Sequence, residues 1–156
     1  MVTENGPKVI EFNCRLGDPE TQVILPRLAT DLVEICLAVA EGRLNTTPIL
    51  WSSDACVGVV MAPRGYPSVH ATGESISGLQ QAAARGLVFQ AGTRQGKELE
   101  EQVVTDGGRV FTIVGMAAEM YQARAQAYEG IALCSLDGGF YRGDIATDIE
   151  NRESWE

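Results

Sequence analysis

Hydrophobic and polar residues alternate along residues 8–15, near the start of the chain. One side of this two-residue period is apolar: Ile10, Phe12 and Cys14. The other side carries an acid, an amide and a guanidinium in a row: Glu11, Asn13 and Arg15. Such alternation predicts a β-strand with an apolar face and a polar face. The polar groups gather where the predicted strand ends, and such places often hold ligand sites.

The turn Gly17-Asp18-Pro19 follows the predicted strand. Asp18 before Pro19 indicates a helix start, with Asp18 as the N-cap and Pro19 as the first helical residue. The spacing up to residue 42 predicts a helix in two pieces, because Pro26 disfavours helix at the residue before it. The second piece begins at Asp31 in a capping-box-like pattern. Its apolar face, which we expect to lie in the core, consists of Leu32, Ile35, Cys36, Val39 and Ala40.

The pattern turns from helical to β-rich at residues 45–48, and this is the best candidate for a domain boundary. Beyond it, short strands are predicted at residues 55–62, 87–89, 101–105 and 109–115. Residues 106–108 are predicted to join the last two strands as a hairpin turn. The pattern therefore divides the chain into residues 1–46, residues 47–145 and a polar tail at 146–156.

The stretch 116–132 has the periodicity of a helix packed on one side. Its apolar face consists of Met116, Met120, Ala123, Ala127 and Ile131. Residues 140–142 are predicted to add a last edge strand. The acidic, polar sequence from Asp144 onward predicts a frayed end.

The composition of the chain says little about its fold but excludes some classes of function. Hydrophobic residues make up 45% of the chain, enough for a buried core, and the formal net charge is -9. This charge argues against general nucleic-acid binding, which needs a basic surface. Small anionic ligands need only a local cluster of positive side chains, for which the candidates are Arg15, Arg27, Arg64 and Arg109.

The four cysteines are widely and irregularly spaced, so neither a zinc site nor a redox motif is expected. We expect them to be buried free thiols, as is usual in the reducing cytosol. The sequence has no signal-peptide pattern and no apolar run long enough to span a bilayer. These features predict a cytoplasmic protein without a membrane partner.

Glu11 and Asn13 are candidate metal ligands. Residues two apart on a strand point the same way, and carboxylate and amide oxygens suit Mg²⁺. Arg15, next on the same face, has a planar fork suited to a phosphate or a carboxylate. The alternative is a solvent-facing strand on which an acid and an amide meet by chance.

Two glycine-containing turns each allow two interpretations, one functional and one structural. Residues 63–67 either place Arg64 or Tyr66 near a substrate or form a rigid loop, and the rigid loop is favoured. Gly107-Gly108-Arg109 could hold a phosphate through backbone N–H groups and the guanidinium, although such a pattern is more often a simple turn.

The string Val9-Ile10-Glu11-Phe12-Asn13-Cys14-Arg15, followed by Gly17-Asp18-Pro19-Glu20-Thr21-Gln22, closely resembles the end of the ATP-grasp domain of phosphoribosylamine–glycine ligases. The resemblance continues through Thr30–Glu34. Strings at residues 65–67, 88–93, 107–110 and 140–145 are similar, in the same order, to the C-terminal domain of that family. Gln90 departs from the pattern, since many members have His there.

The resemblance implies an α+β fold: the closing piece of an ATP-grasp domain, followed by a small β-rich domain with one packed helix. It also implies that the first domain and most of the ATP-grasp domain precede residue 1, so that this chain is a C-terminal fragment without activity of its own. Glu4-Asn5-Gly6 would then be the hairpin turn that leads into the strand at residues 8–15.

The implied reaction is the ATP-driven ligation of glycine to 5-phosphoribosylamine, which gives glycinamide ribonucleotide in purine biosynthesis. Mg²⁺ or Mn²⁺ would be held by Glu11 and Asn13 and would neutralise charge on the transferring phosphoryl group. Arg15 would hold phosphate or the glycine carboxylate as a catalytic residue.

The resemblance also assigns substrate contacts to the turn after the predicted strand. Asp18 would act as a catalytic group that orients the attacking amine, together with Glu20. Gly17 and Pro19 would line the substrate site, and Arg109 would lie near the ribose phosphate.

Two other functions remain open at this point. A carboxylase-type ATP-grasp ligase shares the Glu-x-Asn metal pair but usually continues with a Glu-His-type string where this chain has Gly17–Gln22. The other alternative is a non-catalytic module that serves only folding or association.

Overall fold

A three-stranded antiparallel sheet in the order β3-β8-β5 is the centre of the fold. The structure, a computed structural model, describes residues 1–96 and 102–147. The strands are β3 (Ala55–Met61), β8 (Phe111–Ala117) and β5 (Leu87–Gln90). Strand β8 lies in the middle and pairs with β3 from Ala55↔Ala117 to Met61↔Phe111. The predicted strands at 55–62 and 87–89 are thus confirmed.

Helix α4 (Met120–Ala132) packs on one face of this sheet at very short range. A Cβ atom added to Gly115 of β8 would lie 2.0 Å from the carbonyl oxygen of Ala123. A Cβ added to Gly130 would lie 2.7 Å from Cγ2 of Ile113. The helix therefore contacts the strand closely at two glycines, one near each end of its buried face. We call these two contacts, at Gly115 and Gly130, the glycine notches.

The predicted helical face is confirmed at Ala123, Ala127 and Ile131, which are all fully buried. The predicted start at residue 116 was wrong. Met116 and Ala117 continue β8, and the helix begins at Met120 after Glu119. Pairing with β3 thus extends the strand into a stretch whose local pattern is helical.

A second antiparallel sheet has the order β6-β7-β4-β9. Its strands are β6 (Thr93–Gln95), β7 (Val103–Thr105), β4 (Ser75–Ser77) and β9 (Ser135–Leu136), and the short helix α3 (Leu79–Ala83) follows β4. The predicted hairpin at residues 106–108 was wrong, because β7 pairs with β6 and β4 while β8 pairs with β3 and β5. Residues 106–110 therefore cross from one sheet to the other. Of the predicted strand at 101–105, Glu101 lies outside the described residues.

The chain begins with a small hairpin of β1 (Val2–Thr3) and β2 (Gly6–Pro7), which confirms the turn predicted around Glu4-Asn5-Gly6. The strand predicted at residues 8–15 was wrong for this chain. Those residues are in no strand, and their apolar side chains face solvent, with Phe12 84% exposed. A strand needs a hydrogen-bonding neighbour, and in the described chain only Lys8 of this stretch has backbone bonds to one, with Met1.

The two-piece helix is confirmed, with α1 (Thr21–Ile24) and the 3-10 turn η1 (Leu25–Arg27) before Leu28 and α2 (Leu32–Ala40) after it. Asp31 caps α2 by accepting a hydrogen bond from Val33 N at 2.7 Å. Asp18 does not cap α1, contrary to prediction. The helix begins at Thr21, three residues later, and the Asp18–Pro19 peptide bond is cis.

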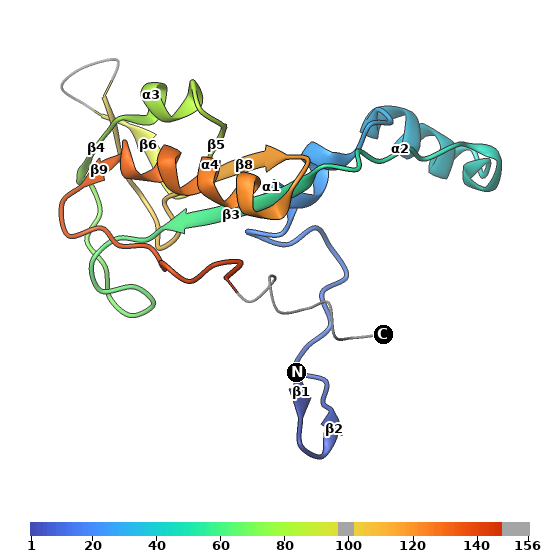
Figure 1. Cartoon of the computed structure of the whole chain (residues 1–156), viewed down its shortest axis with the longest axis horizontal. Coiled ribbons are helices and arrows are strands. Elements are labelled where there is room, and N and C mark those ends of the chain that lie inside the picture. The colour runs from blue at the N-terminus through green and yellow to red at the C-terminus, as the bar shows by residue number, and fades with distance from the viewer. Residues whose placement is uncertain (97–101, 148–156) are drawn as a thin grey trace.

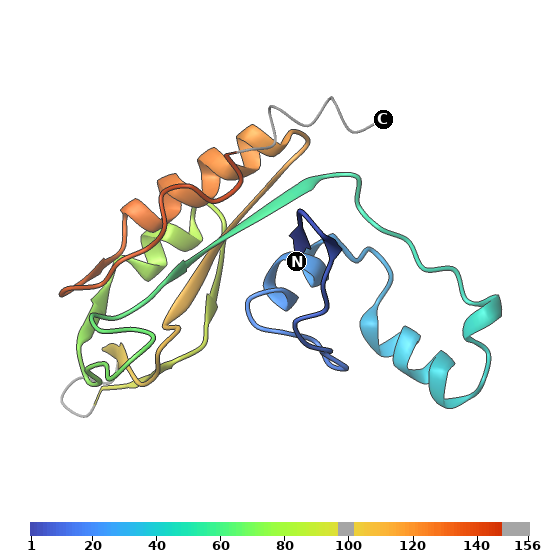
Figure 2. The same cartoon turned by 90° about the horizontal axis from the view of Figure 1, so that it is seen from below.

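Helix α2 and the 3-10 turn η2 (Leu44–Thr46) form an arm that projects away from the sheets (Figures 1 and 2). The apolar face predicted for the core was wrong. Leu32 is 40% exposed, Val39 is 58% exposed and Cys36 is exposed, whereas only Ala38 of this helix is buried. The periodicity is that of an amphipathic helix, but the described chain supplies no surface to cover it.

Helix α1 packs on the face of the first sheet opposite to α4, as Figure 2 shows. Its contact runs through Gly58 of β3, where an added Cβ would lie 2.8 Å from Cγ1 of Val23. Ile145 and Ala146 also pack against the core, so the frayed end predicted from residue 144 was wrong as far as Thr147. Residues 148–156 lie outside the described residues. The domain boundary near residue 46 stays a prediction.

Three smaller predictions can also be compared with the structure. Instead of an edge strand at 140–142 there is one isolated bridge, between Ala62 and Phe140. All four cysteines are free, as predicted, but Cys14 and Cys36 are exposed rather than buried. Within the described residues, none of the helices has the length and hydropathy needed to cross a membrane.

Candidate functional site

An ion pair between Asp18 and Arg109 joins two parts of the predicted site that lie 91 residues apart in sequence. Arg109 Nε donates to Asp18 Oδ2 at 2.8 Å, and Gln22 Nε2 donates to Asp18 Oδ1 at 2.6 Å. The side chains of Arg109 and Asp18 are 44% and 38% exposed, so both can be reached from solvent. The hydrogen bond to Asp18 raises the pKa of Arg109, and the guanidinium stays charged.

Both partners are held by the backbone around them. Asp18 lies directly before α1, which rests on the sheet at Gly58. Arg109 lies in the segment that crosses between the two sheets. Its carbonyl oxygen accepts from Gly92 N at 2.8 Å, and the next residue, Val110, donates to Met61 O at 2.9 Å. The fold therefore brings the pair together on two separate anchors.

Tyr66 forms the neighbouring wall of the site. A Cβ atom added to Gly108 would lie 2.8 Å from Cδ2 of Tyr66 and 3.2 Å from Cε1 of His70. Tyr66 also interacts with Arg109 and contributes, less than Asp18 does, to raising the pKa of that guanidinium. The strings at 65–67 and 107–109 therefore converge on one place, and Tyr66 lies beside Arg109, the residue predicted to bind substrate.

Gly17 and Glu20 form a compact turn beside Asp18. The carbonyl oxygen of Gly17 accepts from Thr21 N at 2.9 Å and from Thr21 Oγ1 at 2.5 Å. The carboxylate of Glu20 occupies the space of a Gly17 side chain, because an added Cβ would lie 1.7 Å from Glu20 Oε2. Any residue other than glycine at position 17 would push this carboxylate away.

Pro19 and Glu20 also line a mostly apolar cavity of about 320 Å³ beside β3 of the first sheet. The remaining lining comes from Val23 of α1, residues 56–58 of β3, Met120, Ile145 and Ala146. The turn therefore borders the cavity through Pro19 and Glu20 and contacts Arg109 through Asp18.

Glu11 and Asn13 lie side by side, as the two-residue period predicts, although they are not in a strand. Asn13 Nδ2 donates to Glu11 Oε1 at 2.9 Å, and both side chains are exposed. A carboxylate and an amide oxygen fit Mg²⁺ or Mn²⁺ as two of its ligands. In residues 1–96 and 102–147, no group of three or more His, Cys, Asp or Glu side chains could hold a metal. Further ligands would have to be water, phosphate or protein groups beyond this set.

The other candidate arginines lie in contacts of their own. Arg15 Nη1 donates to Leu16 O at 3.1 Å, and Arg27 Nη2 donates to Ser52 O at 3.2 Å. Arg64 lies 3.9 Å from the carboxylate of Asp137. The sequence interpretation favoured a rigid loop over a substrate role for Tyr66, and it did not include His70 in the site. The only local signal for His70 was that it is the sole histidine of the chain.

Comparison with known proteins decides the family. Residues 56–148, more than half of the chain, match the family model described as "Phosphoribosylglycinamide synthetase, C domain". The chain belongs to the phosphoribosylglycinamide synthetase family. This result confirms the resemblance stated from the sequence and the α+β fold class that it implied.

Relatives of known name match almost the whole chain. A phosphoribosylamine–glycine ligase of Nostoc sp. is 50% identical over 154 residues, which are 97% of this chain and 36% of that protein. The trifunctional purine biosynthetic protein adenosine-3 of Bos taurus is 47% identical over 93% of this chain and 14% of its own length.

A solved structure agrees with the fold. The crystal structure of phosphoribosylamine–glycine ligase from Thermotoga maritima matches with a TM-score of 0.76 and 35% sequence identity, over 94% of this chain and 35% of that chain. The chain thus spans about a third of the ligases that it matches, in their C-terminal portion.

Proposed function

We propose that this chain is the C-terminal part of an ATP-dependent ligase that joins glycine to 5-phosphoribosylamine in the cytoplasm. The relatives named phosphoribosylamine–glycine ligase support the reaction. The observation that carries the proposal is the Asp18–Arg109 pair. The pair joins residues 56–148, which match the family's C domain, to the string that resembles the end of the ATP-grasp domain, so that both parts contribute to one site.

In this proposal Arg109 binds the ribose phosphate. A guanidinium has five N–H donors, and Asp18 takes only the one on Nε, so donors remain for a phosphate. Asp18 orients the substrate amine, and Glu20 lies beside it across Gly17. Gly17 and Pro19 shape the turn so that both carboxylates are held next to the same substrate.

Glu11 and Asn13 would hold Mg²⁺ or Mn²⁺. Such a metal, bound together with ATP, neutralises charge on the phosphoryl group that passes to the glycine carboxylate. Arg15, two residues further, binds phosphate or the glycine carboxylate. The Asn13–Glu11 hydrogen bond orients the carboxylate before the metal binds.

The ATP-binding part of the ligase would come from the two thirds of the relatives that this chain does not span. Two exposed features support an extensive contact with that part. They are the apolar side of residues 8–16, where Phe12 is 84% exposed, and the arm, where Val33 is 65% exposed. We expect the preceding region to add a strand beside residues 8–15 and to cover α2.

The test uses a chimaera, termed the completed ligase, in which the preceding region of the Nostoc ligase is joined to this chain. We expect ADP release that depends on both glycine and phosphoribosylamine, and no turnover by the 156-residue chain alone. The intact Nostoc ligase is the positive control. A folded, ATP-binding completed ligase without turnover would contradict the proposal, and association without turnover would favour the non-catalytic module.

A further inference from the structure

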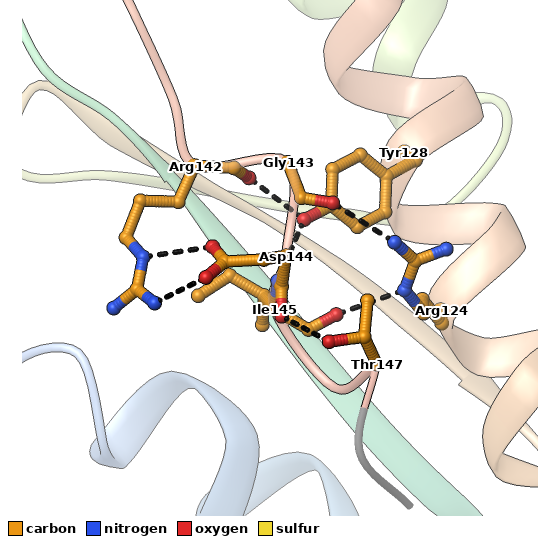
Figure 3. A network of polar contacts seen from close by, with 7 residues as sticks. All are labelled: Arg124, Tyr128, Arg142, Gly143, Asp144, Ile145 and Thr147. Atoms are coloured by element: carbon orange, nitrogen blue, oxygen red, sulfur yellow. Dashed lines mark hydrogen bonds and ion pairs between the residues drawn. The ribbon is translucent and has the colours of Figure 1, made fainter. Parts of the chain in front are cut away.

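The segment that follows β9 returns to α4 and is held there along its backbone, as Figure 3 shows. We call residues 142–147 the strap. Arg124 of α4 donates from Nε to Ile145 O and from Nη2 to Gly143 O, both at 2.9 Å. One guanidinium thus clamps two carbonyl groups of the strap.

Tyr128, one helical turn further, holds two more backbone groups. Its hydroxyl donates to Arg142 O at 2.7 Å and accepts from Ile145 N at 3.1 Å. The Arg124 guanidinium carbon lies 4.5 Å from the centre of the Tyr128 ring, so the two side chains also hold each other. The four bonds are made to backbone atoms and therefore fix the path of the strap rather than any one of its side chains.

The polar groups of the strap itself contribute less to this attachment. Arg142 and Asp144 form an ion pair with each other that is 70% and 61% exposed, and exposed pairs stabilise little. Ala146 has a φ of +58°, in the left-handed region that is unfavourable for alanine. Such a conformation persists only where the surroundings impose it, and here the fixed Ile145 backbone directly precedes it.

The strap ends against the site. Ile145 and Ala146 line the 320 Å³ cavity together with Pro19 and Glu20. The residue next to Pro19 is Asp18, which is bonded to Arg109. The cavity is already partly open to solvent, and a displaced strap would widen that opening and remove one of its lining surfaces.

We propose that Arg124 and Tyr128 are positioning residues for the ligase reaction. They hold the strap, and the strap keeps the turn at residues 17–20 in the place where Asp18 meets Arg109. In the described part of the chain, neither side chain is bonded to Asp18 or Arg109, so both act through the strap. The inference rests on the proposed function for its effect on catalysis.

The first test uses the 156-residue chain and the alkylation of Cys56, which lines the cavity. Tyr128→Phe removes two of the four bonds and keeps the ring. Tyr121→Phe, on the same helix with a side chain that is 62% exposed, is the matched control. Peptide mass spectrometry after N-ethylmaleimide treatment measures the alkylation rate of Cys56. The alkylation rate of Cys134, whose thiol is also half-buried, serves as the internal reference.

We expect Tyr128→Phe to raise the alkylation rate of Cys56 by at least about fivefold, since local opening governs access to a half-buried group. The alkylation rate of Cys134 in Tyr128→Phe, and that of Cys56 in the Tyr121→Phe control, should stay within about twofold of the rates in the unsubstituted chain. An unchanged Cys56 rate in both Tyr128→Phe and Arg124→Gln would overturn the role of these residues in holding the strap.

The second test uses the completed ligase with Tyr128→Phe, Arg124→Lys and Arg124→Gln. We expect KM for phosphoribosylamine to rise by about fivefold or more in Arg124→Gln, and less in Arg124→Lys, which can still bond one carbonyl. KM for ATP should stay within about twofold. A purely structural role would lower the amount of active enzyme and leave both KM values unchanged, which would overturn the proposal.

The two tests separate this inference from the proposed function. A completed ligase that is inactive without any substitution would contradict the proposed function, and with it the catalytic effect of Arg124 and Tyr128. The Cys56 rates in the 156-residue chain would then still decide whether these residues hold the strap. An active completed ligase with unchanged KM values in all three variants would contradict the positioning role alone.

Discussion

The Asp18–Arg109 pair should matter far more for catalysis than for stability. It is a single hydrogen bond of 2.8 Å through Nε, between side chains that are 38% and 44% exposed. Pairs this exposed are worth about 0.2–1 kcal/mol, because water and salt screen them. A double-mutant cycle with Asp18→Asn and Arg109→Gln in the 156-residue chain should therefore give a coupling energy below about 1 kcal/mol in urea unfolding.

Asp18→Asn is the informative member of that cycle. The amide oxygen can still accept the hydrogen bond from Gln22, now 2.6 Å, but the negative charge is gone. In the completed ligase we expect kcat/KM to fall at least about tenfold, or about 1.4 kcal/mol of transition-state stabilisation. A coupling energy above about 2 kcal/mol together with normal kcat/KM would refute this reasoning, since the pair would then serve the fold.

Three further substitutions and one control variant test the packing. Gly115→Ala should lower the free energy of unfolding by about 2 kcal/mol or more, because its Cβ would lie 2.0 Å from Ala123 O. Gly143→Ala is the control: no atom lies within 4 Å of the added Cβ, so the free energy of unfolding should change by less than about 0.5 kcal/mol. Val33→Glu on the arm should leave the melting temperature of the 156-residue chain unchanged but lower that of the completed ligase by several degrees. Ala146→Gly should stabilise the chain in urea by about 0.5–1 kcal/mol, since glycine adopts positive φ without strain; a loss of stability would show that the Ala146 methyl group packs better than its strain costs.

The sequence was informative wherever a pattern is local. The two-residue period placed Glu11 and Asn13 side by side, and the helical period found the buried face of α4 at Ala123 and Ala127. Asp31 was recognised as a cap because its partner lies only two residues away. In each of these cases the interaction that decides the structure lies within the same element.

Predictions failed where distant segments decide the structure. Residues 106–108 look like a hairpin turn, but β7 and β8 each pair with other strands and belong to different sheets. The apolar period of α2 is real, yet burial also needs a covering surface, which the described chain does not supply.

The same limit applies to the site. Asp18 and Arg109 were each predicted as substrate residues, but nothing local shows that they meet across 91 residues. Arg124 and Tyr128 have no local signal, because they are half-buried residues beside the apolar face of α4 and are not part of its periodic pattern. Their hydrogen-bond partners in the strap lie 14 to 21 residues away in sequence.

The two glycine notches under α4 determine which parts of the molecule share a common frame. At Gly115 the strand lies close to the helix backbone near Ala123, and at Gly130 the helix lies close to Ile113, so helix and strand are in tight contact at two separate points. The strap is anchored on α4 between these notches, and Arg109 lies two residues before β8 begins. We therefore expect both to keep a fixed position relative to the central strand. A change in the distance between Asp18 and Arg109 would then require the turn at residues 17–20 to leave its place beside the strap as well.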